Sequence, residues 1–436
     1  MGTEHQSPHL TAADAARFLG VKTATIYAYV SRGLIRSERI GPGRERRYRR
    51  DDVLRLKRRA EVRVDPSSAA RQAFEHSAAP ILDSSLTLIT EQELYYRGVP
   101  VTALARTHSF EQVVALLWCG DLEAPVTELA KPVPPFVERT WVQSAGRRLA
   151  PWFAFQSVLP RLAAADPAGD DLNPSAVRRT GARILLAEVA CLERLAAAEP
   201  VPSPVAAGGR AGADPSAAPR GMVAHSLARV WHAADPALAG ALIEAALVLL
   251  ADHELNVSTL AARTAASGRA SPYHAVLAGL AAAHGTLHGQ ASILVSELLR
   301  AVARPQRARR VVGEYLRSHR PLPGFGHRVY RTRDPRAAAL WQLLRAAAPG
   351  HPAMQTAEAL AEAVQEMVTD APVNVDLPLA VLAAVLGLPA GASEALFIVA
   401  RTAGWIAHAL EQYRTGGLLR PRARYVGPIP ERANTS

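Results

Sequence analysis

Cysteine is scarce in this chain, and aromatic residues are few. There are 2 cysteines among 436 residues. Neither Cys119 nor Cys191 belongs to a CxxC pair, which excludes a disulfide framework and a cysteine-rich metal site. We expect both thiols to be buried and inert. Aromatic residues make up 6% and hydrophobic residues 49%. Alanine and leucine dominate the hydrophobic share, and both favour helix.

Long hydrophobic runs are also absent. The longest apolar stretch, residues 236–251, is interrupted by Glu244 and is too short to cross a bilayer. The first residues contain no hydrophobic region of the kind found in signal peptides, and no internal repeat is visible. We therefore expect a cytoplasmic protein of the mainly α fold class, without a membrane partner.

Positive charge is concentrated near the N-terminus. The formal net charge is +11, and residues 1–65 hold 15 Lys+Arg against 8 Asp+Glu, which leaves only +4 for the rest of the chain. A basic excess on one small segment predicts a polyanionic partner for that segment. Only 3 of the 50 basic residues are lysine, and this arginine bias also fits a GC-rich genome.

The basic segment has the pattern of a helix-turn-helix unit. Residues 11–19 and 23–32 predict two helices, and Thr11 can cap the first because Asp14 stands three residues further on. Two helices joined by a short glycine-containing turn form the helix-turn-helix motif. Residues 39–49 then predict a β-hairpin wing with Gly-Pro-Gly at its tip.

This segment resembles the winged helix-turn-helix head of MerR-type regulators, through Leu10 to Val21, Thr25-Ile26-Tyr27, Arg32 to Ile35 and Arg47-Tyr48. The resemblance implies binding of double-stranded DNA, with contacts to the major groove from Lys22, Thr23, Thr25 and Tyr27. Contacts to phosphate, which orient a protein without reading sequence, would come from Arg44, Arg46 and Arg47. A vestigial or protein-binding domain is the alternative.

Five short motifs in the rest of the chain carry the candidate chemistry. In order they are Asp252-His253-Glu254, Leu287-His288-Gly289, Gly324-Phe325-Gly326-His327-Arg328, Asn374-Val375-Asp376 and Arg401-Thr402-Ala403-Gly404-Trp405. Condensing an enolised carbonyl compound with a dicarboxylate requires a carboxylate base and preplaced donors for the developing oxyanion. It also requires arginines, which bind carboxylates bidentately. The motifs supply all three.

From about residue 91 to residue 430 the chain resembles the citrate synthase family. The resemblance implies an all-helical body with a large subdomain and a smaller one, roughly residues 283–372, that closes over the substrates. The implied substrates are an acyl-CoA and oxaloacetate, with no separate cofactor. A homodimer is also implied, because Arg420 would reach the oxaloacetate site of the neighbouring subunit.

The resemblance also assigns roles to individual residues. Asp376 would take the proton from the acetyl methyl group, and its apolar neighbours could raise its basicity by desolvation. His288 would stabilise the enol, and His327 would polarise and protonate the oxaloacetate carbonyl. Oxaloacetate itself would be held by His253, Arg336, Arg401 and Arg420.

Domain boundaries follow from these patterns. We predict a DNA-binding domain at residues 1–62, a linker at residues 63–90 and the synthase-like domain at residues 91–436. Residues 199–221 are rich in Pro, Ala, Gly and Ser without periodicity, which predicts a flexible surface insertion. His284 and His288 stand four residues apart, but because no third ligand lies nearby we expect no metal site.

Two departures from the family pattern leave the acyl group open. Residues 377–380 are Leu-Pro-Leu-Ala where many members carry an aromatic residue and then Ser-Gly, and Gln290 stands where a small residue is common. We expect a citrate synthase that uses acetyl-CoA. The alternatives are a 2-methylcitrate synthase that uses propionyl-CoA, and a one-component regulator whose synthase body senses metabolites.

Overall fold

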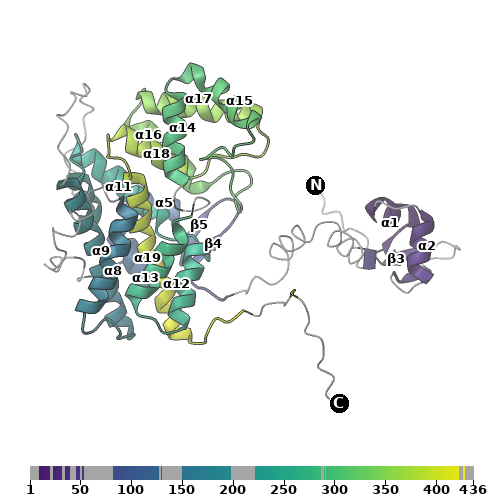
Figure 1. Cartoon of the computed structure of the whole chain (residues 1–436), viewed down its shortest axis with the longest axis horizontal. Helices are drawn as coiled ribbons and strands as arrows, with labels where there is room; N and C mark the ends of the chain where they lie inside the picture. The colour runs from purple at the N-terminus through teal and green to yellow at the C-terminus, as the bar shows by residue number, and fades with distance from the viewer. Residues whose placement is uncertain are drawn as a thin grey trace, which may run out of the picture. The chain divides into compact units, whose positions relative to one another are not determined.

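The computed structural model describes residues 9–19, 23–31, 35–39, 46–49, 52–53, 82–126, 129, 150–197, 221–285, 289, 291–421 and 426–427. The chain divides into two compact units, Met1–Asp83 and Ser84–Ser436, called the head and the body below. Each has its own hydrophobic core, and Figure 1 labels most of their helices and some of their strands.

The head combines two helices with a small antiparallel sheet. Its elements are β1 (His9–Leu10), α1 (Ala12–Leu19), α2 (Thr23–Ser31), β2 (Ser37–Arg39) and β3 (Arg46–Arg49), and the strand order is β1-β3-β2. Its buried apolar side chains are Ala15, Ala16, Ile26, Ile35, Tyr48 and Val53. Both predicted helices and both hairpin strands are present, whereas the predicted hairpin tip lies outside the described residues.

Polar contacts fix the ends of these elements. The Thr11 hydroxyl accepts a hydrogen bond from the Asp14 backbone N–H at 3.1 Å and donates to the Asp14 carboxylate at 2.6 Å, which is the predicted capping contact. Asp52 is 1% exposed. It accepts hydrogen bonds of 2.9 and 3.1 Å from the Arg36 guanidinium, so its buried charge is compensated.

The body opens with a three-stranded antiparallel sheet. Its strands β4 (Thr87–Ile89), β5 (Leu94–Tyr96) and β6 (Val99–Pro100) pair in that order. β4 lies inside the predicted linker, residues 63–90, and that boundary therefore needs correction. Pairing of Thr87 with Tyr96 makes the segment part of the body, which begins at Ser84.

Most of the remaining body is one helical group. Its helices are α5 (Val101–Thr107), α6 (Phe110–Cys119), α8 (Pro151–Ala165), α9 (Pro174–Ala197), α10 (Met222–Val230), α11 (Pro236–Leu250), α12 (Val257–Ser267), α13 (Pro272–Ala283) and α19 (Ala392–Thr415). α19 is buried almost throughout, because α9, α11, α12 and α13 all pack against it. Such a helix is expected to be apolar on all sides, but α19 also carries buried polar and charged residues, which are Ser393, Glu394, Arg401, Thr402, His408, Glu411 and Gln412.

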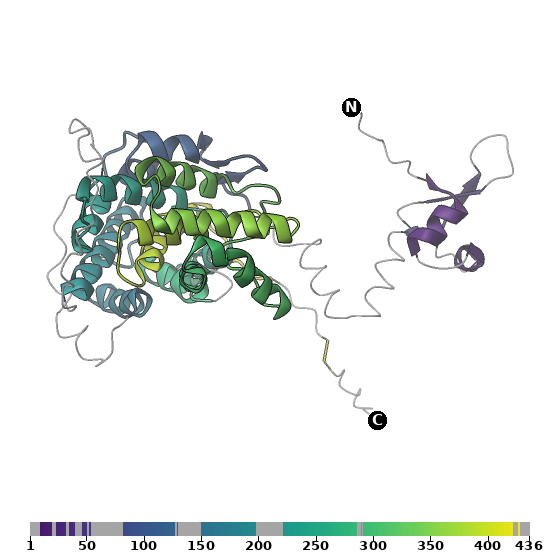
Figure 2. The same ribbon diagram turned by 90° about the horizontal axis from the view of Figure 1, so that it is seen from above.

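A second helical group follows α13 in the chain. It contains α14 (Ala291–Val302), the 3-10 turn η2 (Pro305–Arg307), α15 (Ala308–Arg317), α16 (Pro335–Ala347), α17 (Pro352–Met367) and α18 (Asp376–Val385). α18 packs against α14, α16 and α17, so this group continues past residue 372, the predicted end of the smaller subdomain. Both groups belong to the one body, which Figure 2 shows from above.

The prediction for one cysteine was wrong. Cys191 is buried, and burial raises the pKa of its thiol to about 12. Cys119, however, is exposed. It is the last residue of α6, directly before Gly120, whose left-handed conformation ends the helix, and an apolar sequence neighbourhood did not predict this position.

Two further observations concern the described residues alone. No helix among them is long and apolar enough to cross a membrane, and they contain no cluster of three His, Cys, Asp or Glu side chains suited to a metal ion. The predicted insertion at residues 199–221 lies outside the described part of the chain except for Gly221, which directly precedes α10.

Candidate active site

The first site segment is the turn between α11 and α12. It carries His253, which is 8% exposed. Asn256 ends the turn by capping α12, since its side chain accepts hydrogen bonds from the backbone N–H groups of Ser258 and Thr259. Glu254 adopts a positive φ of 53°. The turn is therefore a fixed, non-helical platform for the His253 imidazole.

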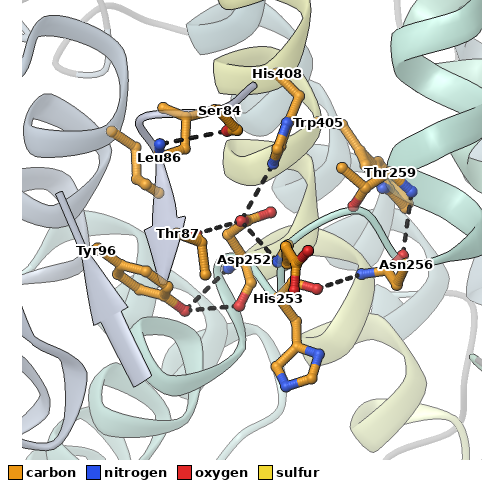
Figure 3. Close-up of polar contacts among 12 residues, drawn as sticks. Ser84, Leu86, Thr87, Tyr96, Asp252, His253, Asn256, Thr259, Trp405 and His408 are labelled. Atoms are coloured by element: carbon orange, nitrogen blue, oxygen red, sulfur yellow. Dashed lines mark hydrogen bonds and ion pairs between the residues drawn. The ribbon is translucent and has the colours of Figure 1, made fainter. Parts of the chain in front are cut away.

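Asp252 connects this turn to neighbouring elements of the body, as Figure 3 shows. Its carboxylate accepts hydrogen bonds from the Thr87 hydroxyl at 2.5 Å, from His408 Nε2 at 3.2 Å and from the Glu254 backbone N–H at 3.2 Å. The Tyr96 hydroxyl contacts both the backbone N–H and the carbonyl oxygen of Asp252 at 3.0 Å. Strands β4 and β5, which carry Thr87 and Tyr96, and helix α19, which carries His408, thus hold the turn in place.

The charge on Asp252 is stabilised in spite of its burial. Burial by itself opposes ionisation, but His408, Arg401 and the Thr87 hydroxyl lower the pKa of this carboxyl below its ordinary value. A buried carboxylate with these partners is a structural anchor for the site.

The second segment is the loop that carries His327. Gly324 and Gly326 adopt φ values of 87° and 76°, which favour glycine. The Gly326 N–H donates to the Pro372 carbonyl at 2.7 Å, and the Asn374 side-chain amide donates to the Gly326 carbonyl at 2.9 Å. These bonds attach the His327 loop to the segment that leads into α18 and Asp376.

The His327 imidazole is held as a neutral hydrogen-bond donor. Its Nδ1 atom accepts from the backbone N–H groups of Val329 at 3.0 Å and Tyr330 at 3.3 Å. The proton of the neutral ring therefore lies on Nε2. Burial, and next the Arg336 cation, lower the pKa of His327 to about 4.

The two described site histidines lie close together. The ring centroids of His253 and His327 are 5.3 Å apart, and Tyr330 lies beside both rings. The Tyr330 hydroxyl is 3.2 Å from His253 Nε2. Tyr330 was not among the predicted site residues, although its position three residues after His327 was a signal that could have found it.

Arg336 is the second residue of α16, and a carboxylate holds its side chain. Asp334 caps the helix and accepts two guanidinium hydrogen bonds from Arg336, at 3.0 and 2.8 Å. It also accepts from the Val375 backbone N–H at 3.2 Å. Both side chains are buried, so the cation is fixed in direction. The Asp-Pro pair before Arg336 was a helix-start signal that could have identified Asp334 as its support.

Arg401 enters from α19 and is 1% exposed. Its Nε donates to the Leu250 carbonyl at 3.0 Å, which binds α19 to the end of α11. The guanidinium carbon lies 4.9 Å from the centre of the Phe397 ring. Burial lowers the pKa of Arg401 to about 10, so the group remains cationic at neutral pH.

Asp376 is the first residue of α18 and is half-buried. Its backbone N–H donates to the Asn374 side-chain oxygen at 3.1 Å. Burial raises the pKa of Asp376 to about 6, while the Arg336 and Arg401 cations act in the opposite direction. A carboxylate with a pKa close to neutral is well suited to act as a general base.

Two predicted residues are not placed in this group. His288 lies outside the described residues, although its neighbour Gly289 is buried against Trp152, and a Cβ at Gly289 would lie 2.7 Å from the indole ring. Arg420 is exposed, beyond the end of α19. The structure therefore brings together the following predicted residues: His253, His327, Arg336, Asp376 and Arg401.

The predicted DNA-binding residues lie on two elements of the head. Thr23 and Tyr27 are exposed on α2, and Thr25 on the same helix is half-buried. Arg46 and Arg47 lie on β3. Lys22 and Arg44 lie outside the described residues.

Comparison with known proteins gives the class of each unit. Residues 76–422 match the family described as citrate synthase, C-terminal domain, and residues 10–61 match a helix-turn-helix domain. The chain is 30% identical to citrate synthase 2 of Bacillus subtilis over 79% of this chain and 93% of that protein. It is 28% identical to 2-methylcitrate synthase 1 of Corynebacterium glutamicum, over 84% of this chain and 99% of that protein.

A solved structure has the same fold as the body. It is the ternary complex of citrate synthase from Thermoplasma acidophilum with carboxymethyl coenzyme A and oxaloacetate, with a TM-score of 0.68 and 24% identity over 82% of this chain and 97% of that one. The chain belongs to the citrate synthase family. It is an acyltransferase of that family, preceded by a helix-turn-helix domain.

Proposed function

We propose that the chain is a citrate synthase, which condenses acetyl-CoA with oxaloacetate and water to give citrate and CoA. The observation that carries this proposal is that Asn374 joins the loop of His327 to the start of α18, where Asp376 lies. Burial raises the pKa of Asp376 to about 6, and His327 is neutral and can donate from Nε2. Enolisation requires a base that is ionised at neutral pH, and addition to a ketone requires a donor at its oxygen.

This proposal assigns a sequence of proton transfers to the site, with the role of His288 carried over from the family resemblance. Asp376 removes a proton from the methyl group of the thioester, and His288 donates a hydrogen bond to the thioester oxygen of the resulting enolate. The enolate carbon then attacks the oxaloacetate ketone, whose oxygen takes a proton from His327. Water hydrolyses the citryl-CoA intermediate and releases CoA.

The cations of the site fit the carboxylates of oxaloacetate. Arg336 and Arg401 are both buried, and His253 Nε2 lies 3.2 Å from the Tyr330 hydroxyl. Because Asp334 and the Leu250 carbonyl fix the two guanidinium groups, little side-chain entropy is lost when the dicarboxylate binds. We assign Arg420 to the same ligand, supplied by the neighbouring subunit.

An apolar helix face supports the dimer that this assignment requires. Val257 is 65% exposed and Leu260 is 37% exposed, both on α12. They line a surface groove together with Ala261, Thr264, Ala265 and Ala282. Exposed apolar groups gathered on one face are typical of an interface, and we propose that a second copy of the chain covers them.

The preference for one acyl group is tested by comparing two thioesters as substrates. We expect a higher kcat/KM with acetyl-CoA than with propionyl-CoA, measured as oxaloacetate-dependent thiol release by the full chain. A preference for propionyl-CoA would make the protein a 2-methylcitrate synthase, the alternative that the Corynebacterium glutamicum relative represents. One methylene group discriminates only about 10- to 200-fold, so both substrates must be assayed side by side.

The folded head supports a second function, that of a one-component regulator of the MerR type. Thr23 and Tyr27 are exposed on α2, the second helix of the motif, and a dimeric body would space two heads on a duplex. We expect an electrophoretic shift of the DNA upstream of the chain's own coding region. The Arg46→Ala/Arg47→Ala variant should weaken it. A shift that is independent of sequence and lost with added salt would count against regulation.

A further inference from the structure

The segment that leads to Arg420 is held by one side chain of α19. The Gln412 amide nitrogen donates hydrogen bonds to the carbonyl oxygens of Gly416 at 3.0 Å and Gly417 at 2.9 Å. Both glycines have positive φ values, 69° and 80°, so the chain turns sharply here after the end of the helix. Leu419 N–H then donates to the Ser267 hydroxyl at 3.1 Å, at the end of α12.

The orientation of the Gln412 amide is itself fixed. Arg263 of α12 is 3% exposed, and its Nε donates to the Gln412 side-chain oxygen at 2.9 Å. Since that oxygen faces a permanent donor, the amide nitrogen must face the glycine carbonyls. Arg263 Nη1 also donates to the Glu411 carboxylate at 2.8 Å, which compensates its buried charge.

The same cluster holds the first residues of the body. The second Glu411 oxygen accepts from the backbone N–H of Ser85 at 2.8 Å and from its hydroxyl at 2.9 Å. We call Arg263, Glu411 and Gln412 the tail cluster. It joins the first residues of the body, helix α12 and the C-terminal tail (residues 416–421).

We propose that the tail cluster positions the C-terminal tail so that Arg420 enters the oxaloacetate site of the partner subunit. This inference rests on the proposed function, in which Arg420 acts across the dimer. Arg420 is exposed and lies three residues beyond Gly417, the last carbonyl that Gln412 holds. α12 carries both Arg263 and the apolar face assigned to the dimer. The tail therefore leaves the body from the helix on which the partner would pack.

Gln412→Glu is the sharpest variant, because the two side chains have the same shape. The glutamate oxygen can still accept from Arg263, but it cannot donate to the carbonyls of Gly416 and Gly417. We expect the KM for oxaloacetate to rise about tenfold, as expected from the loss of two hydrogen bonds, with the KM for acetyl-CoA and kcat nearly unchanged. Gln342→Glu, the same change at an exposed position on α16, is the matched control and should leave all three constants at their wild-type values.

Mixed dimers separate a role across the interface from a merely structural one. When a Gln412→Glu chain is paired, through two affinity tags, with an Asp376→Asn chain, the only site with a base belongs to the Gln412→Glu chain. That site receives Arg420 from the other chain, whose tail cluster is intact. We therefore expect the KM for oxaloacetate to return to the wild-type value in this dimer.

The outcomes distinguish this inference from the function on which it rests. A KM that stays raised in the mixed dimer, or an unchanged KM in the Gln412→Glu homodimer, overturns the role of the tail cluster. The assignment of Arg420 has its own test, a mixed dimer of Asp376→Asn and Arg420→Ala chains. If the KM for oxaloacetate is as high in that dimer as in the Arg420→Ala homodimer, Arg420 does not act across the interface. The assignment of Arg420 and the role of the tail cluster then both fail.

Discussion

Asp376→Asn should lower kcat about 100- to 10,000-fold, the range typical of losing a general base, and leave the KM for oxaloacetate little changed. Asparagine keeps the size of the side chain and the start of α18, where the Asp376 backbone N–H donates to Asn374. It cannot accept the methyl proton. Asp370→Asn, the same change at an exposed residue six positions earlier, is the control and should retain full activity. Equal activity in both variants would remove Asp376 from the mechanism.

The pH profile of the wild-type enzyme gives a second measure of the same base. The pKa of Asp376 is raised to about 6 by burial, so the active, ionised form predominates above that pH and is lost below it. We expect kcat to fall tenfold per pH unit on the acid side of pH 6. His327 stays neutral over this range because its pKa is lowered to about 4. A kcat that is constant from pH 7 to pH 5 would contradict this assignment.

Gly404→Ala should be among the most destabilising single-methyl changes in the body. A Cβ at this position would lie 2.4 Å from the Ala251 carbonyl oxygen and 2.6 Å from the Asp252 carboxylate. Neither group can move easily, because Asp252 is held by Thr87, His408 and Tyr96. We expect a loss of about 1–3 kcal/mol in the free energy of unfolding, the range for overpacked cores.

Tryptophan fluorescence during denaturation measures this loss in the body alone, because all 6 tryptophans lie at residue 118 or later. Gly268→Ala is the matched control. Gly268 has a φ of −78°, and its nearest neighbour to an added Cβ is 3.4 Å away, so we expect a change within about 0.5 kcal/mol. Equal stability of the two variants would show that the contact between α19 and the Asp252 turn is looser than described.

The helical fold could be predicted from local patterns. Asn256 and Asp235 cap the helices that follow them, and the glycines around His327 do take the positive φ values that glycine permits. The motifs that contain His253, His327 and Asp376 were visible in the sequence, and the roles given to these residues come from the resemblance to the citrate synthase family and stay predictions.

Contacts between distant segments could not be predicted in this way. The Thr87 hydroxyl meets Asp252, and His408 reaches the same carboxylate from α19, yet no periodicity links these positions. The short strand β4 was assigned to a linker because a three-residue strand gives little signal until its partner, β5, is known. The exposure of Cys119 likewise depends on where α6 ends.

The same limit applies to the tail cluster. Arg263 and Gln412 are far apart in the chain, and only their meeting at 2.9 Å indicates that the amide of Gln412 faces the tail. The family resemblance pointed to Arg420, but nothing in the sequence identified the residues that hold the segment before it.

The central claim is that this body forms a carbon–carbon bond, and product analysis tests it most directly. The full chain would be incubated with oxaloacetate and acetyl-CoA labelled in both acetyl carbons, and the products examined by mass spectrometry. We predict citrate that carries both labelled carbons, formed together with one free thiol per molecule. A folded, dimeric protein that forms no labelled tricarboxylate would contradict the account.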